Sequence, residues 1–282
     1  MIINKMLVWP KVFACLIMLM MTAIGHNVFA AIDINTELKA GYDASVAGNV
    51  DKAVSSFNAV LSIEPDNMQA HLGLGNLCFQ KGDVDGAIAA FNKILIKEPD
   101  NVNANLGLGN VYLQKGDVDG AITAFNKVLA KDPENVNVNL GLGNLYSQKG
   151  DVDGAITAFN KVLVKDPENV SVNLSLGNGY LQKGNVDGAI AAFNKVLAKD
   201  AGNLDARRGL GNGYLQKGDR EQAIALLKEV VSVNNRDQYA YFALGAAYLS
   251  GDNKDLAMEQ YKILNDLNPV VAKQLYEMIE RK

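Results

Sequence analysis

The sequence predicts an all-α solenoid of seven helix-turn-helix repeats that ends in a C-terminal capping helix. The main observation is a period of 34 residues, which is typical of stacked supersecondary units. Residues 117–136 read DVDGAITAFNKVLAKDPENV, and residues 151–170 repeat them with one change. The segment QKGDVDGAI occurs three times, at 80–88, 114–122 and 148–156. We therefore expect seven units, at 34–67, 68–101, 102–135, 136–169, 170–203, 204–237 and 238–271.

Residues 1–30 stand apart from the repeat and have the parts of a secretory signal peptide. Lys5 and Lys11 provide the positive charge, and an apolar run of thirteen residues follows. Small residues at Val28 and Ala30 then predict cleavage after Ala30. A spanning helix needs about 20 apolar residues, so an uncleaved inner-membrane anchor is the less favoured alternative. We expect an exported protein, either periplasmic or secreted.

Each unit is expected to form two helices, as residues 102–135 illustrate. Asn101 is a suitable N-cap for the first helix, and Gly116 is suited to end it in the left-handed conformation. Asp117 caps the second helix, which Pro133 ends because proline cannot continue the hydrogen-bond ladder. Apolar residues recur at helical spacing in both segments. They are Leu108, Gly109, Val111 and Tyr112 in the first, and Ala121, Ile122, Ala124, Phe125, Val128 and Leu129 in the second.

The end of the chain is expected to close the stack. Every proline after residue 30 falls just after a second helix, and Pro269 is the last of them. Beyond it, Leu275 and Ile279 share one apolar face, while charged residues share the opposite face. A solenoid needs a terminal element with a polar outer side, so we expect a capping helix over 272–282.

This pattern resembles the tetratricopeptide repeat family over 34–271. The family's small residue in the first helix is matched at Gly75, Gly109, Gly143, Gly177, Gly211 and Gly245. Its aromatic residue three places on is matched at Tyr112, Tyr146, Tyr180, Tyr214 and Tyr248. Asn105, Asn139 and Asn173 stand where the family usually has tryptophan, which is expected to cost some packing. The resemblance implies a right-handed superhelix whose first helices line a concave groove for a protein or peptide partner.

A helical wheel assigns one asparagine of each first helix to the groove side. A row of amides can bond both N–H and C=O groups of an extended chain, because each amide has donors and an acceptor. Leucines beside them would take apolar side chains. Gly73, Gly107 and Gly141 are also expected to face the groove and to let a ligand approach the backbone. The predicted peptide-binding residues are Asn76, Asn110, Asn144, Asn178, Asn212, Asn103, Asn137, Leu72, Leu106, Leu140, Leu174 and Arg208.

The last two units differ from the others. Leucine and glycine occupy the groove positions at which some family members carry basic residues, except near Arg207 and Arg208. A grip on a C-terminal carboxylate is therefore not expected. Tyr239 and Phe242 lie on the groove side near Arg208, where they form either a local hot spot for binding or end-cap packing.

The composition argues against several classes of function. Removal of residues 1–30 changes the net charge from −4 to −6, and nucleic-acid binding would need a basic stripe. Cys78 is then the single cysteine, so no intramolecular disulfide is expected. His71 is the single remaining histidine and has no partners for a zinc site or a catalytic triad. We expect no catalytic residue, no metal, no small-molecule cofactor and no nucleic-acid partner.

The expected function is a non-catalytic protein-interaction scaffold or adaptor in the cell envelope. It would bind an extended polypeptide segment in its concave groove. One alternative is a chaperone-like holder of exported unfolded chains, which would use the same groove with looser specificity. Another is an accessory subunit of a secretion, pilus or polysaccharide-export complex.

Overall fold

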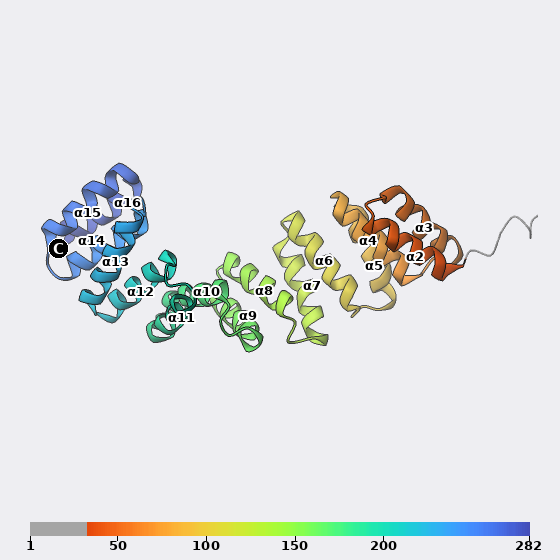
Figure 1. Cartoon of the computed structure of the whole chain (residues 1–282), viewed down its shortest axis with the longest axis horizontal. Coiled ribbons are helices and arrows are strands. Elements are labelled where there is room, and N and C mark those ends of the chain that lie inside the picture. Colours follow the sequence, from red (N-terminus) through yellow and green to blue (C-terminus); the bar gives the residue numbers. More distant parts are fainter. Residues whose placement is uncertain (1–32) are drawn as a thin grey trace, which may run out of the picture. The chain divides into compact units, whose positions relative to one another are not determined.

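The computed structural model describes residues 33–282, and its fifteen regular elements there are all α-helices (Figure 1). The predicted signal segment, 1–30, lies outside these residues. Fourteen helices form seven consecutive pairs, and one more helix follows. The first three pairs are α2 (Ile34–Val46) with α3 (Val50–Ile63), α4 (Met68–Lys81) with α5 (Val84–Lys97), and α6 (Val102–Lys115) with α7 (Val118–Lys131). The next four are α8 (Val136–Lys149) with α9 (Val152–Lys165), α10 (Val170–Gln182) with α11 (Val186–Lys199), α12 (Leu204–Lys217) with α13 (Arg220–Val233), and α14 (Gln238–Ser250) with α15 (Lys254–Leu267); α16 (Pro269–Arg281) comes last.

The chain divides into two compact parts at the boundary between Lys131 and Asp132. The first part holds α2–α7 and the second holds α8–α16. Inside each part, the two helices of a pair contact each other, and the second helix of one pair contacts the first helix of the next. The predicted all-α class of stacked helix pairs is confirmed. None of the helices in residues 33–282 combines the length and apolar character that a membrane span needs.

Local sequence determines where the helices begin and end. The Asn101 side chain accepts a hydrogen bond from the Ala104 N–H at 3.1 Å, which satisfies one free donor of α6. Gly116 ends that helix with φ of 78°, a value that favours glycine. Asp117 accepts from the Gly120 N–H at 2.9 Å at the start of α7. These predicted caps are confirmed.

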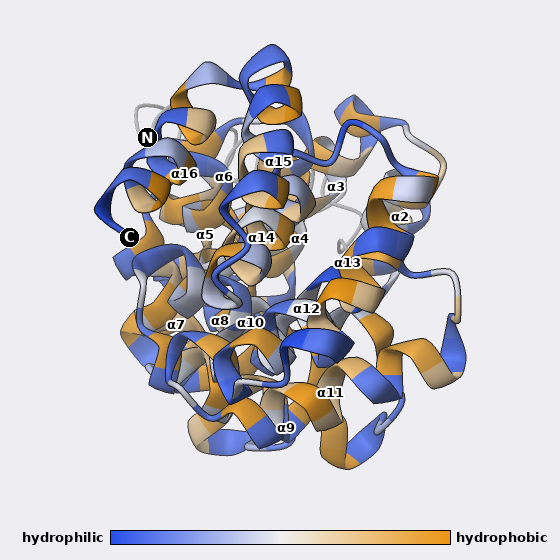
Figure 2. Cartoon of the chain, turned by 90° about the vertical axis from the view of Figure 1, so that its left-hand side faces the viewer, coloured by the Kyte–Doolittle hydropathy of each residue, from blue (hydrophilic) through white to orange (hydrophobic). Residues whose placement is uncertain are grey.

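Apolar and polar residues alternate along the helices (Figure 2), and the apolar sides meet around buried phenylalanines. Phe91 of α5 is 1% exposed, and its ring lies between two glycines of neighbouring first helices. A Cβ on Gly75 would lie 2.6 Å from Phe91 Cε1, and one on Gly107 would lie 2.4 Å from Phe91 Cζ. Both distances are too short for real atoms, so only glycine allows these helices to approach the ring so closely.

This packing corrects one expectation about the groove. Gly73 and Gly107 do not bare their backbone to a ligand, because each contacts a phenylalanine of the preceding pair. Gly73 is buried, and a Cβ there would lie 2.4 Å from Phe57 Cζ. These glycines therefore serve the stacking of pairs within the first part.

The asparagines at the tryptophan position also have a role that the sequence did not reveal. Asn105 is 1% exposed, and its Nδ2 donates to the carbonyl oxygens of Pro99 at 3.0 Å and Asn101 at 2.9 Å. Asn139 and Asn173 make the equivalent bonds, to Pro133 and Pro167 at 3.1 Å. The substitution thus exchanges tryptophan packing for hydrogen bonds that fix the turn before each first helix. The expected loss is at least partly offset by these bonds.

Other polar side chains occupy the same phase in two further pairs. His71 Nε2 lies 2.9 Å from the Pro65 carbonyl oxygen, and Arg207 donates to the Ala201 carbonyl oxygen at 2.6 Å. In five consecutive pairs, therefore, the fourth residue of the first helix contacts the carbonyl six residues earlier in the chain. We call this contact the joint bond.

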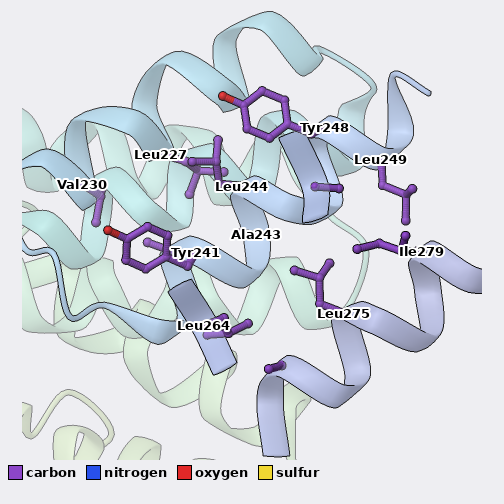
Figure 3. Close-up of a cluster of buried hydrophobic side chains, with 13 residues drawn as sticks. Leu227, Val230, Tyr241, Ala243, Leu244, Tyr248, Leu249, Leu264, Leu275 and Ile279 are labelled. Atoms are coloured by element: carbon purple, nitrogen blue, oxygen red, sulfur yellow. The ribbon is translucent and has the colours of Figure 1, made fainter. Parts of the chain in front are cut away.

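The last helix begins earlier than the expected 272–282. Pro269 is its first residue, where a missing N–H has no consequence, and Asn268 caps it by accepting from the Val270 and Val271 N–H groups. Leu275 is 0% exposed and joins a cluster with residues of α13, α14 and α15. Figure 3 shows Leu275 and Ile279 of this helix in that cluster, near Leu249 of α14. α16 therefore covers the apolar side that the last pair would otherwise leave exposed.

Candidate functional site

One asparagine in each of five first helices faces away from the core. Within the first part these are Asn76 on α4 and Asn110 on α6; within the second they are Asn144 on α8, Asn178 on α10 and Asn212 on α12. We call these five residues the asparagine row. The first four are exposed and the last is half-buried. Among residues 33–282, none of the five side chains has a hydrogen-bond partner.

The reason for this exposure is the position of the row on its helices. Gly109 and Val111 flank Asn110 and are both buried, so the helix turns its apolar side inward on either side of the amide. Asn103 and Asn137, the second residues of α6 and α8, are exposed as well. Within residues 33–282 these predicted amides are therefore unpaired and fully or partly accessible, which is what a ligand-binding amide requires.

The predicted leucines are less accessible than the asparagines. Leu72 is half-buried against a core cluster that contains Phe91 and Ile94. Leu140 and Leu174 pack in the same way against the cores around the next phenylalanines of the second part. Leu106 is also half-buried. These four side chains belong partly to the contacts between pairs, and only their remaining surface is open to a partner.

Arg208 is held by carboxylates. Its guanidinium lies 2.6 Å from Asp237 and 2.6 Å from Asp205, and 5.7 Å from the centre of the Tyr239 ring. Asp237 is 7% exposed and also caps α14 by accepting from the Ala240 N–H at 2.9 Å. Arg208 therefore links α12 to the start of α14, and an anionic partner would compete with two carboxylates already in place.

The aromatic residues near Arg208 divide between the two predicted roles. Phe242 packs against the terminal core cluster, as end-cap packing requires. Tyr239 is 59% exposed and remains available to a partner. Its ring is the accessible part of the predicted hot spot.

Ion pairs join the end of a second helix to the turn that precedes the first helix of the same pair. Lys97 meets Asp66 at 2.7 Å, and Lys165 meets Glu134 at 2.7 Å. The hydrogen bond and charge of Lys97 lower the pKa of Asp66, and those of Lys165 lower the pKa of Glu134. All these groups are largely exposed, so such pairs contribute little to stability. The asparagine row itself carries no formal charge.

No group of three or more His, Cys, Asp or Glu side chains in residues 33–282 is placed to hold a metal ion. Cys78 is half-buried, and burial, followed by the nearby charge of Asp83, raises the pKa of its thiol. A raised pKa favours the unreactive protonated form.

Comparison with known families identifies the repeat. A model described as the cytochrome c-type biogenesis protein H TPR domain matches residues 92–203. Two models described as tetratricopeptide repeat match residues 38–101 and 180–248. No curated protein sequence matches the chain significantly.

Solved structures share the fold. A crystal structure of MamA protein is 29% identical, covers 62% of this chain and 96% of its own, and has a TM-score of 0.54. A second MamA structure is 31% identical, with 59% and 97% coverage and a TM-score of 0.53. YrrB, described as a TPR protein with an unusual peptide-binding site, is 20% identical, with 68% and 100% coverage and a TM-score of 0.56. At that identity the likeness to YrrB shows the fold alone.

Proposed function

Because the chain belongs to the tetratricopeptide repeat family, we propose that it is a non-catalytic scaffold that binds an extended polypeptide segment along its first helices. The asparagine row carries this proposal. Its amides are accessible and unpaired among the described residues, and each can both donate and accept. An extended polypeptide offers both N–H and C=O groups along its length, so it is the matching ligand. YrrB is a precedent only for peptide binding by this fold.

The spacing of the row suits an extended chain. The first helices of neighbouring pairs contact each other inside each part, as α4 contacts α6 and α10 contacts α12. Packed helices lie about 8–10 Å apart, and an extended chain rises about 3.3 Å per residue. Within each part, successive amides should therefore meet roughly every third residue of the ligand. A neutral row of this kind would bind the backbone groups of the ligand, so it would accept many ligand sequences.

The experiment compares two sets of alanine substitutions in the purified protein. The test variant combines Asn110→Ala, Asn144→Ala and Asn178→Ala. The matched control combines Asn126→Ala, Asn160→Ala and Asn194→Ala, which remove exposed asparagines from the second helices α7, α9 and α11. Peptides selected from a random displayed library on the wild-type protein are then measured by fluorescence anisotropy.

We expect the test variant to lose affinity by about 10- to 100-fold, because each hydrogen bond contributes roughly 1 kcal/mol and 1.4 kcal/mol is a factor of ten. The control should bind as the wild type does, and both variants should keep their helix content. Equal losses in both variants, or wild-type affinity in the test variant, would contradict binding along the row. Strong binding of many unrelated apolar peptides would instead indicate the chaperone-like holder.

The proposed setting is the cell envelope, where the protein would serve as a scaffold or as an accessory subunit of an export complex. This part of the proposal is supported by the sequence of residues 1–30, which lie outside the described residues. We expect the protein purified from its native host to begin at Ala31 and to be found outside the cytoplasm. A chain that keeps Met1 and fractionates with the membrane would favour the anchored alternative.

A further inference from the structure

Three residues of the fourth and fifth pairs depart from the repeat. Ser147 stands where the neighbouring pairs have Leu113 and Leu181. Ser175 stands where other pairs have glycine, as at Gly107, and Gly179 stands where Leu145 is found one repeat earlier. Ser147 and Ser175 have no counterpart in the neighbouring pairs, whereas Gly179 recurs as Gly213 in the next pair.

All three residues line one pocket of about 220 Å³ within the second part of the chain. Val152, Ile156 and Phe159 of α9 form its apolar wall, and Asn178 and Gln182 of α10 lie at its polar side. We call it the Ser147 pocket. Among residues 33–282, no Asp, Glu, Lys or Arg lines it, so a charged side chain would be desolvated there without a partner.

The next pair shows why the pocket is open. Gly213 is the equivalent of Gly179, and a Cβ there would lie 3.2 Å from Ile190 Cγ1 and 3.7 Å from Leu181 Cδ2. The leucine therefore occupies the space beside that glycine. The three atoms nearest to a Cβ on Gly179 would belong to Ile156 and Val152, at 3.4–3.7 Å, and none of them to Ser147, whose side chain is shorter than leucine. The Ser147 hydroxyl also donates to the Gly143 carbonyl oxygen of its own helix at 2.8 Å.

We propose that the Ser147 pocket receives a phenylalanine-sized apolar side chain of the polypeptide bound along the asparagine row. The inference rests on the proposed function, since Asn178 belongs both to the row and to the pocket lining. An apolar cavity of roughly 150 Å³ holds a benzene molecule, so 220 Å³ is enough for a phenyl ring. The ring would contact Ile156 and Phe159, while the amide of Asn178 bonds the ligand backbone beside it.

The pocket gives the bound segment a register. The asparagines of the row recur every 34 residues of the protein sequence and are chemically the same. By itself, therefore, the row would bind a ligand equally well after the ligand shifts along it by one repeat. The pocket is lined by residues of α8, α9 and α10. At the equivalent place one repeat later, Leu181 Cδ2 would lie 3.7 Å from a Cβ on Gly213, so a leucine side chain stands where Ser147 leaves space. An apolar anchor in the ligand is therefore accommodated at one position and excluded at the next.

The test fills the pocket with the residue that the neighbouring repeats carry. Ser147→Leu restores the side chain found at Leu113 and Leu181, so the variant is expected to fold. Ser147→Ala is the matched control, because it removes the hydroxyl and leaves the space. The probe is N-acetyl-phenylalanine amide, with N-acetyl-glycine amide as the blank, and the readout is the methyl NMR signals of Ile156 and Val152.

We expect the phenylalanine probe to shift these signals in the wild type and in Ser147→Ala, and not in Ser147→Leu. In the selected peptides, Phe→Ala should weaken binding to the wild type about tenfold or more and should have little effect on binding to Ser147→Leu. No shift in the wild type, or the same shift in Ser147→Leu, would overturn the inference.

The two proposals fail in different ways. Suppose that the peptides lose affinity in the asparagine triple variant but bind Ser147→Leu as they bind the wild type. Binding along the row would then stand, and the role of the Ser147 pocket would be refuted. If probe binding depends on residue 147 but the triple variant keeps full peptide affinity, the Ser147 pocket would stand as a binding site and binding along the row would be refuted.

Discussion

Two asparagines of α6, five residues apart, should have different effects when each is replaced by alanine: one replacement should lower stability, and the other should weaken peptide binding. Asn105 is buried, and its Nδ2 donates to two backbone carbonyls. Asn105→Ala removes two hydrogen bonds of roughly 1 kcal/mol each, while alanine regains about 0.6 kcal/mol of helix propensity. The net loss should be about 1–2 kcal/mol. For a protein of this size, that corresponds to a fall in Tm of about 2–8 °C.

Asn110→Ala is the matched control for stability. That side chain is exposed and unpaired among the described residues, so its removal should change stability by no more than about 0.5 kcal/mol. It should, however, weaken peptide binding, which Asn105→Ala affects only through loss of folded protein. Circular dichroism gives Tm, and anisotropy at 10 °C gives affinity. Asn105→Ala with a wild-type Tm, or an equal fall in Tm for both variants, would refute this division of roles.

Three further predictions follow from contacts described above. Gly107→Ala should lower the urea midpoint, because overpacking against Phe91 costs about 1–3 kcal/mol and the gain in helix propensity is about 1 kcal/mol; a raised midpoint would show that the glycine is not packed. Leu275→Ala should cost about 2–5 kcal/mol in urea unfolding, since the side chain is fully buried; a loss below about 1 kcal/mol would contradict the role of α16. The Cys78 thiol should react with iodoacetamide more slowly than free cysteine at pH 8 and accelerate as the pH rises, because burial raises its pKa; equal rates would argue against this environment.

The helices and their ends could be predicted because their signals are local. Asn101, Gly116 and Asp117 lie within one repeat, and each acts on backbone groups a few residues away. The direction of Gly107 could not be predicted in the same way. A helical wheel separates the two sides of one helix, but it does not show which neighbouring helix covers the boundary between them. Only the position of Phe91 decides that this glycine is packed.

The candidate site shows the same limit. The exposure of Asn110 follows from its phase on the wheel, and the structure agrees with it. Asn105 acts by donating a hydrogen bond to a carbonyl oxygen of the preceding turn. The sequence does not show this contact, so an asparagine in place of tryptophan indicated only a loss of packing. The Ser147 pocket is visible in the sequence as three separate departures spread over 33 residues. Their convergence on one space required the stacking of α8, α9 and α10.

The joint bond makes the chain easy to lengthen. Its donor and acceptor are six residues apart, as in the pair Asn105 and Pro99, so the turn between two helix pairs is specified within a short stretch of sequence. A duplicated 34-residue segment would bring its own turn with it, and the pairs on either side would need no compensating change. The protein can therefore lengthen by duplication of a repeat, and near identity such as that of residues 117–136 and 151–170 is the expected result of a duplication.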